Sequence, residues 1–518
     1  MSTFYTPKYL RIYVWQFLAV ITNLISLFIV IPFLSKDPTL YGIYSVCVST
    51  VALFNYGDLG FLSAGSKYAA ENFARKERSE EIKVIGFVIF VLSVFLCFFA
   101  FLMLFFVVRP EILISGLNTS AQKTFASRLF TILLIFSPTV LVQRTASIIF
   151  GIRVEDFIYQ KLVVGANLIK IASIYLFVSG ASINIVGYFL FVQAVSLTSA
   201  VACLVVASKR YQYDLVFLLR SIRFSKEVYR GTRTLAFSSL FSTVTWVLFH
   251  ELDLYAIARF LGPEQTAFYA IGFSIFSLLR ALNGTIYAPF GIRFNHFRGL
   301  KDEKGLQGFY RKVVTVTQPA VFFPALSIVL LMGPLVLSWV GPAYAPSIGP
   351  GRLLNAVFLF TFLASPAALV ILAREQTRVM NATSLTLVLV YWGGILLTMR
   401  SLGLEAFALM KLISFSCSLV VYVFVSIRLL QLSVSELMRR LVLPLLPGVA
   451  ILLIIALPLL PYLPHSQGKL NLMLVCLYAG ALALVGASVH ALFSSRLRSL
   501  MREVARPLLA HKSLFLQP

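Results

Sequence analysis

Residues 85–108 read IGFVIFVLSVFLCFFAFLMLFFVV, a stretch without a single charged side chain. About 20 apolar residues in an α-helix are enough to cross the hydrocarbon core of a bilayer. The run is continuous, whereas a strand of a membrane barrel alternates between apolar and polar residues. Because backbone groups in lipid must hydrogen-bond to one another, this stretch predicts a membrane-spanning helix.

The rest of the chain has the same character. Of its 518 residues, 59% are hydrophobic and 12% are charged, whereas soluble globular chains have about 45–50% apolar and about 25% charged residues. We therefore expect an all-α polytopic membrane protein with about fourteen transmembrane helices. The predicted spans are 10–33, 41–65, 83–108, 125–150, 158–180, 183–207, 233–260, 265–292, 313–340, 352–373, 379–399, 403–430, 441–463 and 470–493.

The net charge of +24 has an uneven distribution between the predicted loops. Lys and Arg gather in alternate loops, including 75–83, 209–233 and 293–312, and in the C-terminal tail. Loops rich in Lys and Arg stay on the cytoplasmic side of a membrane. The charge therefore predicts topology and not nucleic-acid binding. We expect a multi-pass protein of the cell inner membrane with both termini in the cytoplasm.

The sequence gives no sign of a cofactor or an enzymatic domain. The five cysteines lie inside apolar runs, without spacings typical of metal sites, at Cys47, Cys97, Cys203, Cys417 and Cys476. No GxxxxGK[ST] phosphate loop is present, and the predicted loops are too short for a soluble catalytic domain. We expect no metal, no cofactor and no catalytic residue, and thus a protein that is not an enzyme.

Two pairs of similar segments indicate an internal repeat. The turn LSKDPTLYGIYSV at 34–46 resembles LGPEQTAFYAIG at 261–272, and Arg153 after Phe-Gly-Ile corresponds to Arg374 after Ile-Leu-Ala. Spans 1–6 and 7–12 are then two copies of a six-helix unit. Parallel repeats of this kind form two lobes with the substrate between them.

This repeat predicts five segments along the chain. They are an N-terminal lobe at 1–207, a basic amphipathic linker at 208–232, a C-terminal lobe at 233–431, two additional transmembrane helices at 432–495 and a basic cytoplasmic tail at 496–518.

The turns also carry a family resemblance. YGIY at 41–44, GDLGF at 57–61, KYAA at 67–70 and FLGP at 260–263 resemble Wzx-type polysaccharide and O-antigen flippases. These belong to the multidrug/oligosaccharidyl-lipid/polysaccharide (MOP) exporter superfamily. The resemblance implies MATE-like lobes around a hydrophilic cleft and export of polyprenyl-pyrophosphate-linked oligosaccharide for surface polysaccharide such as lipopolysaccharide O-antigen.

The same resemblance implies partners and raises one discrepancy. It implies H+ or Na+ as a coupling ion, and a polysaccharide polymerase and chain-length regulator as protein partners. Typical Wzx-type flippases lack the last two spans predicted here, whereas lipid II flippases carry such a pair, implicated in holding the lipid tail. The chain has no motif specific to lipid II flippases, so the glycolipid stays open.

Ionisable residues deep in a span are candidates for function, because charge in the bilayer is costly. On span 8, Ser277, Arg280 and Tyr287 share one helix face, and a guanidinium suits pyrophosphate because its fork binds two oxygens at once. With Arg280, three further intramembrane cations are expected to form a positive lumen that binds the substrate. They are Lys170, Lys411 and Arg144.

Acidic and polar residues complete the predicted cleft. Glu251 and Asp253 are the acids of span 7, and with His250 and Asp58 they are candidates for ion coupling or gating. The residues predicted to line the cleft lie on spans 1, 2, 7 and 8. They are Gln16, Asn23, Asn55, Ser242, Ser277 and Tyr287.

Two other functions stay open at this point. A MATE-like cation or drug antiporter of the same fold is one, although an acidic cleft would suit its substrates better than these deep cations. A polytopic glycosyltransferase or polymerase is the other, and such enzymes usually carry a large extracytoplasmic loop or an aspartate-rich site.

Overall fold

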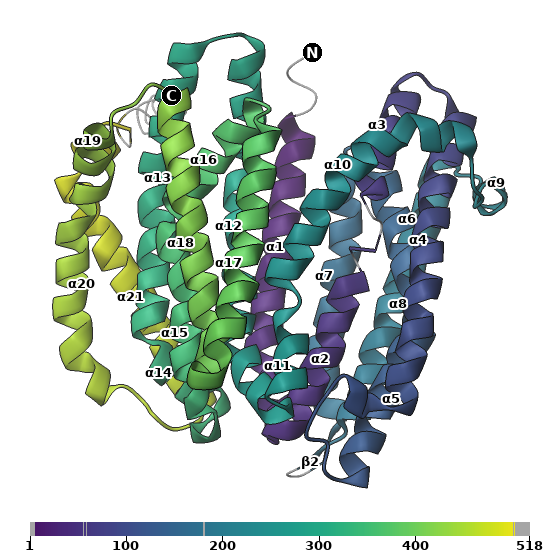
Figure 1. The fold of residues 1–518 in the computed structure, drawn as a ribbon, viewed down its shortest axis with the longest axis horizontal. Helices are drawn as coiled ribbons and strands as arrows, with labels where there is room; N and C mark the ends of the chain where they lie inside the picture. The colour runs from purple at the N-terminus through teal and green to yellow at the C-terminus, as the bar shows by residue number, and fades with distance from the viewer. Residues whose placement is uncertain (1–5, 55, 58–59, 180–181, 501, 503–518) are drawn as a thin grey trace, which may run out of the picture. The chain divides into compact units, whose positions relative to one another are not determined.

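The computed structural model describes residues 6–500 and 502, except 55, 58–59 and 180–181. It confirms the all-α prediction, since helices account for nearly all of the described chain (Figure 1). In this part of the chain the strands are β1 (Val178–Ser179) and β2 (Ser182–Ile183), which pair antiparallel in a small hairpin. The hairpin strands lie where the fifth predicted span ends and the sixth begins.

Contacts between Cα atoms group the chain into two compact units, residues 1–270 and 271–518. The first unit contains α1 (Thr6–Leu34), α2 (Pro38–Phe54), α3 (Phe61–Ala74), α4 (Arg78–Val108), η1 (Pro110–Ile112), α5 (Ser120–Phe136), α6 (Thr139–Gly151), α7 (Asp156–Ser173), η2 (Ile174–Leu176), α8 (Ile185–Tyr211), α9 (Leu215–Arg220), α10 (Lys226–His250), α11 (Asp253–Phe260) and the first turns of α12 (Pro263–Gly299).

The second unit contains the rest of α12, followed by α13 (Glu303–Leu330), α14 (Met332–Val340), η3 (Pro342–Ser347), α15 (Ile348–Ala356), η4 (Val357–Phe360), α16 (Thr361–Ala373), α17 (Thr377–Leu402), α18 (Leu404–Leu429), α19 (Val434–Leu437), the π-turn η5 (Met438–Val442), η6 (Leu443–Leu445), α20 (Leu446–Leu459), η7 (Leu460–Tyr462) and α21 (Lys469–Phe493).

Each of the fourteen predicted spans corresponds to apolar helix. Eleven helices are long and apolar enough to cross a membrane, and the bent pair α5 and α6, with an angle of 41° between them, is a twelfth candidate. The other two predicted spans contain the shorter apolar helices Pro38–Phe54 and Ser239–His250. The protein is therefore a multi-pass membrane protein, and several of its predicted spans, among them the second, the fourth and the seventh, are interrupted helices.

The interruptions have local causes. Pro138 lies between α5 and α6, and a proline lacks the N–H group that would continue the helix. Gly60, at a φ of +80°, precedes α3, and this left-handed backbone conformation favours glycine. A Cβ at Gly60 would also lie 2.4 Å from the Ala236 carbonyl oxygen, so the glycine lets α3 pack directly on α10.

The backbone repeats itself in the loops of the two halves. Among the described residues, six non-glycine residues have a positive φ and form three pairs, Lys76 with Lys301, Val154 with Glu375 and Gln212 with Gln431. They follow α3, α6 and α8 in one half and α12, α16 and α18 in the other. In each case the next N–H bonds to the carbonyl five residues earlier, as in a Schellman cap. These matching caps are what a six-span repeat would produce.

The last two long helices pack within the second unit through small residues. α20 lies beside α21, and α21 also packs on α13 (Figure 1). A Cβ at Gly448 would lie 2.7 Å from the Gly486 carbonyl oxygen, and both glycines adjoin the ring of Phe323. Close backbone approach over glycine is a common way to join helices in lipid, and it fixes α20 and α21 to the rest of the unit.

Candidate functional site

The seventh predicted span breaks at two buried carboxylates. α10 ends at His250 and α11 begins at Asp253. Glu251 is 5% exposed and Asp253 is fully buried. Asp253 is the first residue of α11, where the positive end of the helix dipole favours a carboxylate. The break therefore places Glu251 and Asp253, two of the three acids predicted for ion coupling or gating, at one point inside the first unit.

Tyrosine hydroxyls hold these carboxylates. The Tyr269 hydroxyl donates a hydrogen bond of 2.5 Å to Oδ2 of Asp253. The Tyr56 hydroxyl donates to Oε1 of Glu251 at 3.3 Å and accepts from Nε1 of Trp246 at 3.2 Å. A buried charge is costly unless it is hydrogen-bonded. These tyrosines therefore make it possible for the acids to stay in the interior.

Aromatic rings surround the third predicted coupling residue. The imidazole of His250 lies 4.1 Å from the ring of Trp246 and 4.7 Å from that of Phe249, measured between centroids. His250 is the last residue of α10 and directly precedes Glu251. Asp58 and Asn55, also predicted for this site, lie outside the described residues.

The two tyrosines, Tyr56 and Tyr269, were not among the residues predicted for the site. Tyr56 lies two residues before Asp58, and Tyr269 belongs to the turn that marks the repeat. Neither position identifies the tyrosine as a partner of Glu251 or Asp253, because the bonded residues are far apart in the sequence. A further hydrogen bond of 2.8 Å, from the Tyr255 hydroxyl to Oγ1 of Thr50, joins α11 to α2 close to the break.

In the second unit, Lys411 is enclosed by aromatic rings. Its side chain is fully buried on α18. The ammonium lies 5.4 Å from the ring centroids of Phe273 and Phe276 and 5.2 Å from that of Tyr391. Such distances allow cation–π attraction. Lys411 thus lies within an aromatic cage. The rings of this cage would have to move before a ligand could reach its ammonium group.

Arg280 adjoins the same cage. Its guanidinium carbon lies 6.0 Å from the ring centroid of Phe276, so Phe276 is in contact range of two predicted substrate-binding cations. Arg280 and Ser277 are half-buried, and Tyr287 is buried further along the same helix. The polar face predicted on the eighth span is therefore partly accessible at Arg280 and closed at Tyr287.

The remaining predicted residues lie in the first unit. Arg144 and Lys170 are half-buried on α6 and α7. Asn23 is exposed and accepts a hydrogen bond of 3.1 Å from Nδ2 of Asn167. Gln16 is half-buried on α1 and interacts with the carboxylate of Asp156, and Ser242 is exposed on α10. The four predicted cations are thus divided between the two units, two in each.

A buried ion pair lies where α4 begins and α6 ends. Nη2 of Arg153 is 2.7 Å from Oε1 of Glu81, and the two side chains are 4% and 1% exposed. Nη1 of Arg153 also donates to the Ile149 carbonyl at 2.9 Å. Burial raises the pKa of the nearby Tyr213 hydroxyl. The charge of Glu81 raises this pKa further, whereas the charge of Arg153 lowers it. This pair ties the two helix ends together.

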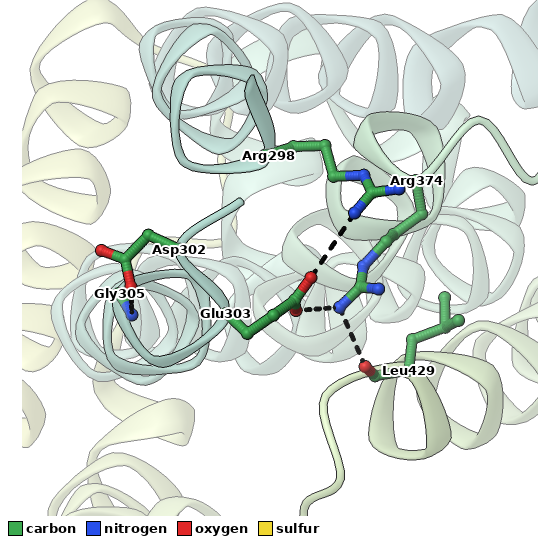
Figure 2. Close-up of polar contacts among 6 residues, drawn as sticks. All are labelled: Arg298, Asp302, Glu303, Gly305, Arg374 and Leu429. Atoms are coloured by element: carbon green, nitrogen blue, oxygen red, sulfur yellow. Dashed lines mark hydrogen bonds and ion pairs between the residues drawn. The ribbon is translucent and has the colours of Figure 1, made fainter. Parts of the chain in front are cut away.

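The second unit has a comparable ion pair. Nη2 of Arg374, which follows α16, contacts the carboxylate of Glu303 and donates to the Leu429 carbonyl at 3.2 Å (Figure 2). Arg298 reaches the same carboxylate at 3.5 Å, and Asp302 caps α13 by accepting from the Gly305 N–H at 2.8 Å. Arg153 and Arg374 were predicted to be equivalent, and each directly precedes a residue of positive φ.

Comparisons with known proteins identify the fold. No family model matches the chain, and no curated protein matches it in sequence. Among solved structures, the lipid II flippase MurJ in an inward closed conformation is similar with a TM-score of 0.70 and 13% identity, over 96% of this chain and 99% of MurJ. An inward-facing multidrug resistance MATE family transporter of the MOP superfamily has a TM-score of 0.60 at 13% identity, over 80% of this chain and 94% of that one.

A eukaryotic MATE transporter has a TM-score of 0.56 at 12% identity, over 83% of this chain and 96% of its own. The chain has the fold of MurJ and the MATE transporters. The predicted fold class is thereby confirmed, and at these identities the similarity concerns the fold alone. MurJ is matched over nearly the whole chain, whereas the MATE transporters leave about a fifth of it unmatched.

Proposed function

We propose that the protein is a flippase that carries a polyprenyl-pyrophosphate-linked oligosaccharide across the inner membrane by alternating access. Both termini would lie in the cytoplasm, on the side of the basic loops. One observation carries this proposal. The match to MurJ includes 96% of this chain and 99% of MurJ, whereas the match to the MATE transporter includes 80% of this chain. The similarity to a lipid II flippase therefore extends over nearly the whole chain.

The charges within the helices support an anionic cargo. Arg144, Lys170, Arg280 and Lys411 all lie inside the apolar helices. A set of like charges in a low-dielectric region attracts ligands of the opposite sign. The pyrophosphate of a polyprenyl-linked sugar has that sign, and Arg280 is partly accessible to it.

The broken span supports ion coupling. Discontinuous helices in transporters often form the sites of coupling ions, and intramembrane carboxylates mark proton and cation pathways. Glu251 and Asp253 lie at such a break, each within reach of a tyrosine hydroxyl. We propose that H+ or Na+ binds there. In surface polysaccharide biosynthesis, a polymerase and a chain-length regulator would receive the exported units.

The test is transport of fluorescent polyprenyl-pyrophosphate oligosaccharide by the full chain in proteoliposomes. Wild type should move the label, Arg280→Ala should abolish movement and Arg280→Lys should restore part of it. Arg400→Ala is the matched control, because Arg400 is exposed at the end of α17 and should transport normally.

Three results would overturn the proposal or its site. If wild type moves no glycolipid and exports a cationic dye, the protein is a MATE-like antiporter. If it lengthens or transfers the sugar instead of moving it, it is a membrane glycosyltransferase or polymerase. If wild type and Arg280→Ala transport equally well, the assignment of the cargo site to Arg280 is wrong.

A further inference from the structure

A cavity of about 420 Å³ lies in the first unit among α3, α6 and the beginning of α7. Its volume is within the range of about 300–1,000 Å³ that is typical of small-molecule sites. Gly151 and Ile152, which border it, directly precede Arg153 at the end of α6. The cavity is therefore on the side of the protein where the basic loops lie. The residues that line it are Leu62, Ser66, Lys67, Ala70, Arg144, Ser147, Ile148, Gly151, Ile152 and Asp156.

Two helices, α3 and α6, supply most of the residues that line the cavity, each from one of its faces. On α6, Arg144, Ser147 and Gly151 recur at helical spacing and point to the same side. On α3, Ser66 and Lys67 follow Leu62 by about one turn. The two helices thus bring two cations and two hydroxyls to the same cavity from sequence positions about eighty residues apart.

The charge of the cavity is positive. Lys67 and Arg144 face a single carboxylate among the lining residues, that of Asp156. Asp156 already interacts with amide side chains, accepting from Nε2 of Gln160 at 3.5 Å and from Gln16. Lys67 is 4.0 Å from Glu71, but both side chains are largely exposed. Such surface pairs contribute little, so the ammonium can turn to another anion.

We propose that this cavity binds the phosphate group of a lipid headgroup. The Arg144 guanidinium can donate to two phosphate oxygens at once, and Lys67 adds a mobile point charge. The hydroxyls of Ser66 and Ser147 can donate to the remaining oxygens. Leu62, Ile148 and Ile152 leave an apolar wall for the first carbons of the tail.

Two lipids offer this chemistry at the basic side of the membrane. One is the polyprenyl pyrophosphate of the proposed cargo, which would be captured here before it is carried across. The other is an anionic phospholipid of the cytoplasmic leaflet, which is attracted to basic residues near the surface. The choice of the polyprenyl lipid rests on the proposed function, whereas phosphate recognition rests on the cavity alone.

The test is a binding measurement on the full chain in nanodiscs made of zwitterionic lipid. Three probes are titrated separately, namely polyprenyl pyrophosphate, phosphatidylglycerol and inorganic pyrophosphate. Arg144→Ala and Lys67→Ala should each weaken binding of the preferred lipid by about tenfold or more, as expected for a lost charge-assisted hydrogen bond. Asp156→Asn should strengthen it, because a competing carboxylate is removed.

Two further variants separate binding from misfolding. Arg75→Ala removes an exposed cation from the same side that does not line the cavity, and it should bind as wild type does. Gly151→Leu keeps both cations and fills space, since a Cβ at Gly151 would meet no atom within 4 Å. Loss of binding in Gly151→Leu at unchanged thermal stability would support the cavity as the site.

The outcomes show which of the two lipids binds, and they separate the phosphate site from the proposed flippase function. Stronger binding of polyprenyl pyrophosphate supports cargo capture, and equal or stronger binding of phosphatidylglycerol supports a site for bulk phospholipid. If Arg144→Ala and Gly151→Leu bind every probe as wild type does, the inference is wrong, even if wild type transports glycolipid. If binding is lost in both variants but wild type transports nothing, the phosphate site stands and the proposed function fails.

Discussion

The guanidinium of Arg153 and the carboxylate of Glu81 form an ion pair at 2.7 Å in which both side chains are almost completely buried. The guanidinium also lies 4.7 Å from the ring of Phe73 and 4.8 Å from that of Tyr211. The cation is thus held by a carboxylate, a carbonyl and aromatic faces from separate helices. The corresponding residue Arg374 forms an ion pair with Glu303. This second pair is less buried, since the side chains of Arg374 and Glu303 are 18% and 47% exposed.

Removal of one partner of the buried pair should destabilise the protein strongly. Arg153→Ala leaves the carboxylate of Glu81 buried beside apolar groups, and breaking such a pair costs about 3–5 kcal/mol. Equilibrium unfolding in bicelles measures the change. Lys83→Ala is the control, because its pair with Glu80 is about half exposed and should contribute less than about 1 kcal/mol. Similar losses in both variants would contradict the role given to burial.

The two ion pairs should differ in their response to salt. Exposed charges are screened by ions in solution, whereas buried charges are screened much less. Raising the salt concentration should therefore reduce the destabilisation caused by Glu303→Gln and leave that caused by Glu81→Gln nearly unchanged. Unfolding of each variant and of wild type at low and high salt measures this difference. An equal salt response would indicate that the two pairs are similarly accessible to solvent.

The sequence predicts the helical elements well because each span is long and apolar. It does not show where the second and seventh spans break, since hydropathy reports composition and not continuity. Gly57 and Gly60 mark the first break only in retrospect, and the second coincides with Glu251, which was singled out as an acid. Elsewhere the predicted spans overlap the helices, but α12 continues to Gly299 and α13 begins at Glu303, well outside the apolar runs 265–292 and 313–340.

The site is only partly predictable from the sequence, for a different reason. Glu251 and Asp253 attract notice because acids are rare in apolar spans, whereas tyrosine is common, with 22 in the chain. Nothing in the sequence marks Tyr269 as the residue bonded to Asp253. The rings around Lys411, which lies on α18, come from α12 and α17, and contacts between segments so far apart require the folded structure.

Loss of the Tyr269 hydroxyl should destabilise the first unit. Tyr269→Phe removes the hydrogen bond of 2.5 Å to a fully buried carboxylate, and an unsatisfied buried polar group costs about 1–3 kcal/mol. Unfolding in bicelles measures the loss. Tyr462→Phe makes the same chemical change at a side chain that is 84% exposed, and its stability should equal that of wild type. In the double variant Asp253→Asn/Tyr269→Phe, the two losses should be less than additive.

A methyl group between α20 and α21 should loosen the last helices. A Cβ at Gly448 would lie 2.6 Å from Cζ of Phe323 and 2.7 Å from the Gly486 carbonyl oxygen. Overpacking of this kind costs about 1–3 kcal/mol, so Gly448→Ala should lower stability. Gly480 on α21 has no atom within 4 Å of its would-be Cβ, so Gly480→Ala should be neutral or slightly stabilising. Thermal unfolding and proteolysis at 464–468 measure both; equal behaviour of the two variants would contradict this packing.

Relief of backbone strain at Val154 should stabilise the loop after α6. Val154 has a φ of 54°, and the left-handed conformation costs an L-residue roughly 1–2 kcal/mol, with β-branched side chains among the least tolerant. Val154→Gly removes that cost and keeps the hydrogen bond from the Glu155 N–H to the Phe150 carbonyl, which closes the cap at 3.1 Å. Stability should rise by about 1 kcal/mol, partly offset by the greater freedom of glycine in the unfolded chain.

Glu375→Gly, at the corresponding position of the second half, should give a smaller gain because Glu is not β-branched. Thermal unfolding of both variants decides the matter: a loss of stability in Val154→Gly would mean that the valine side chain contributes more through packing than its backbone conformation costs.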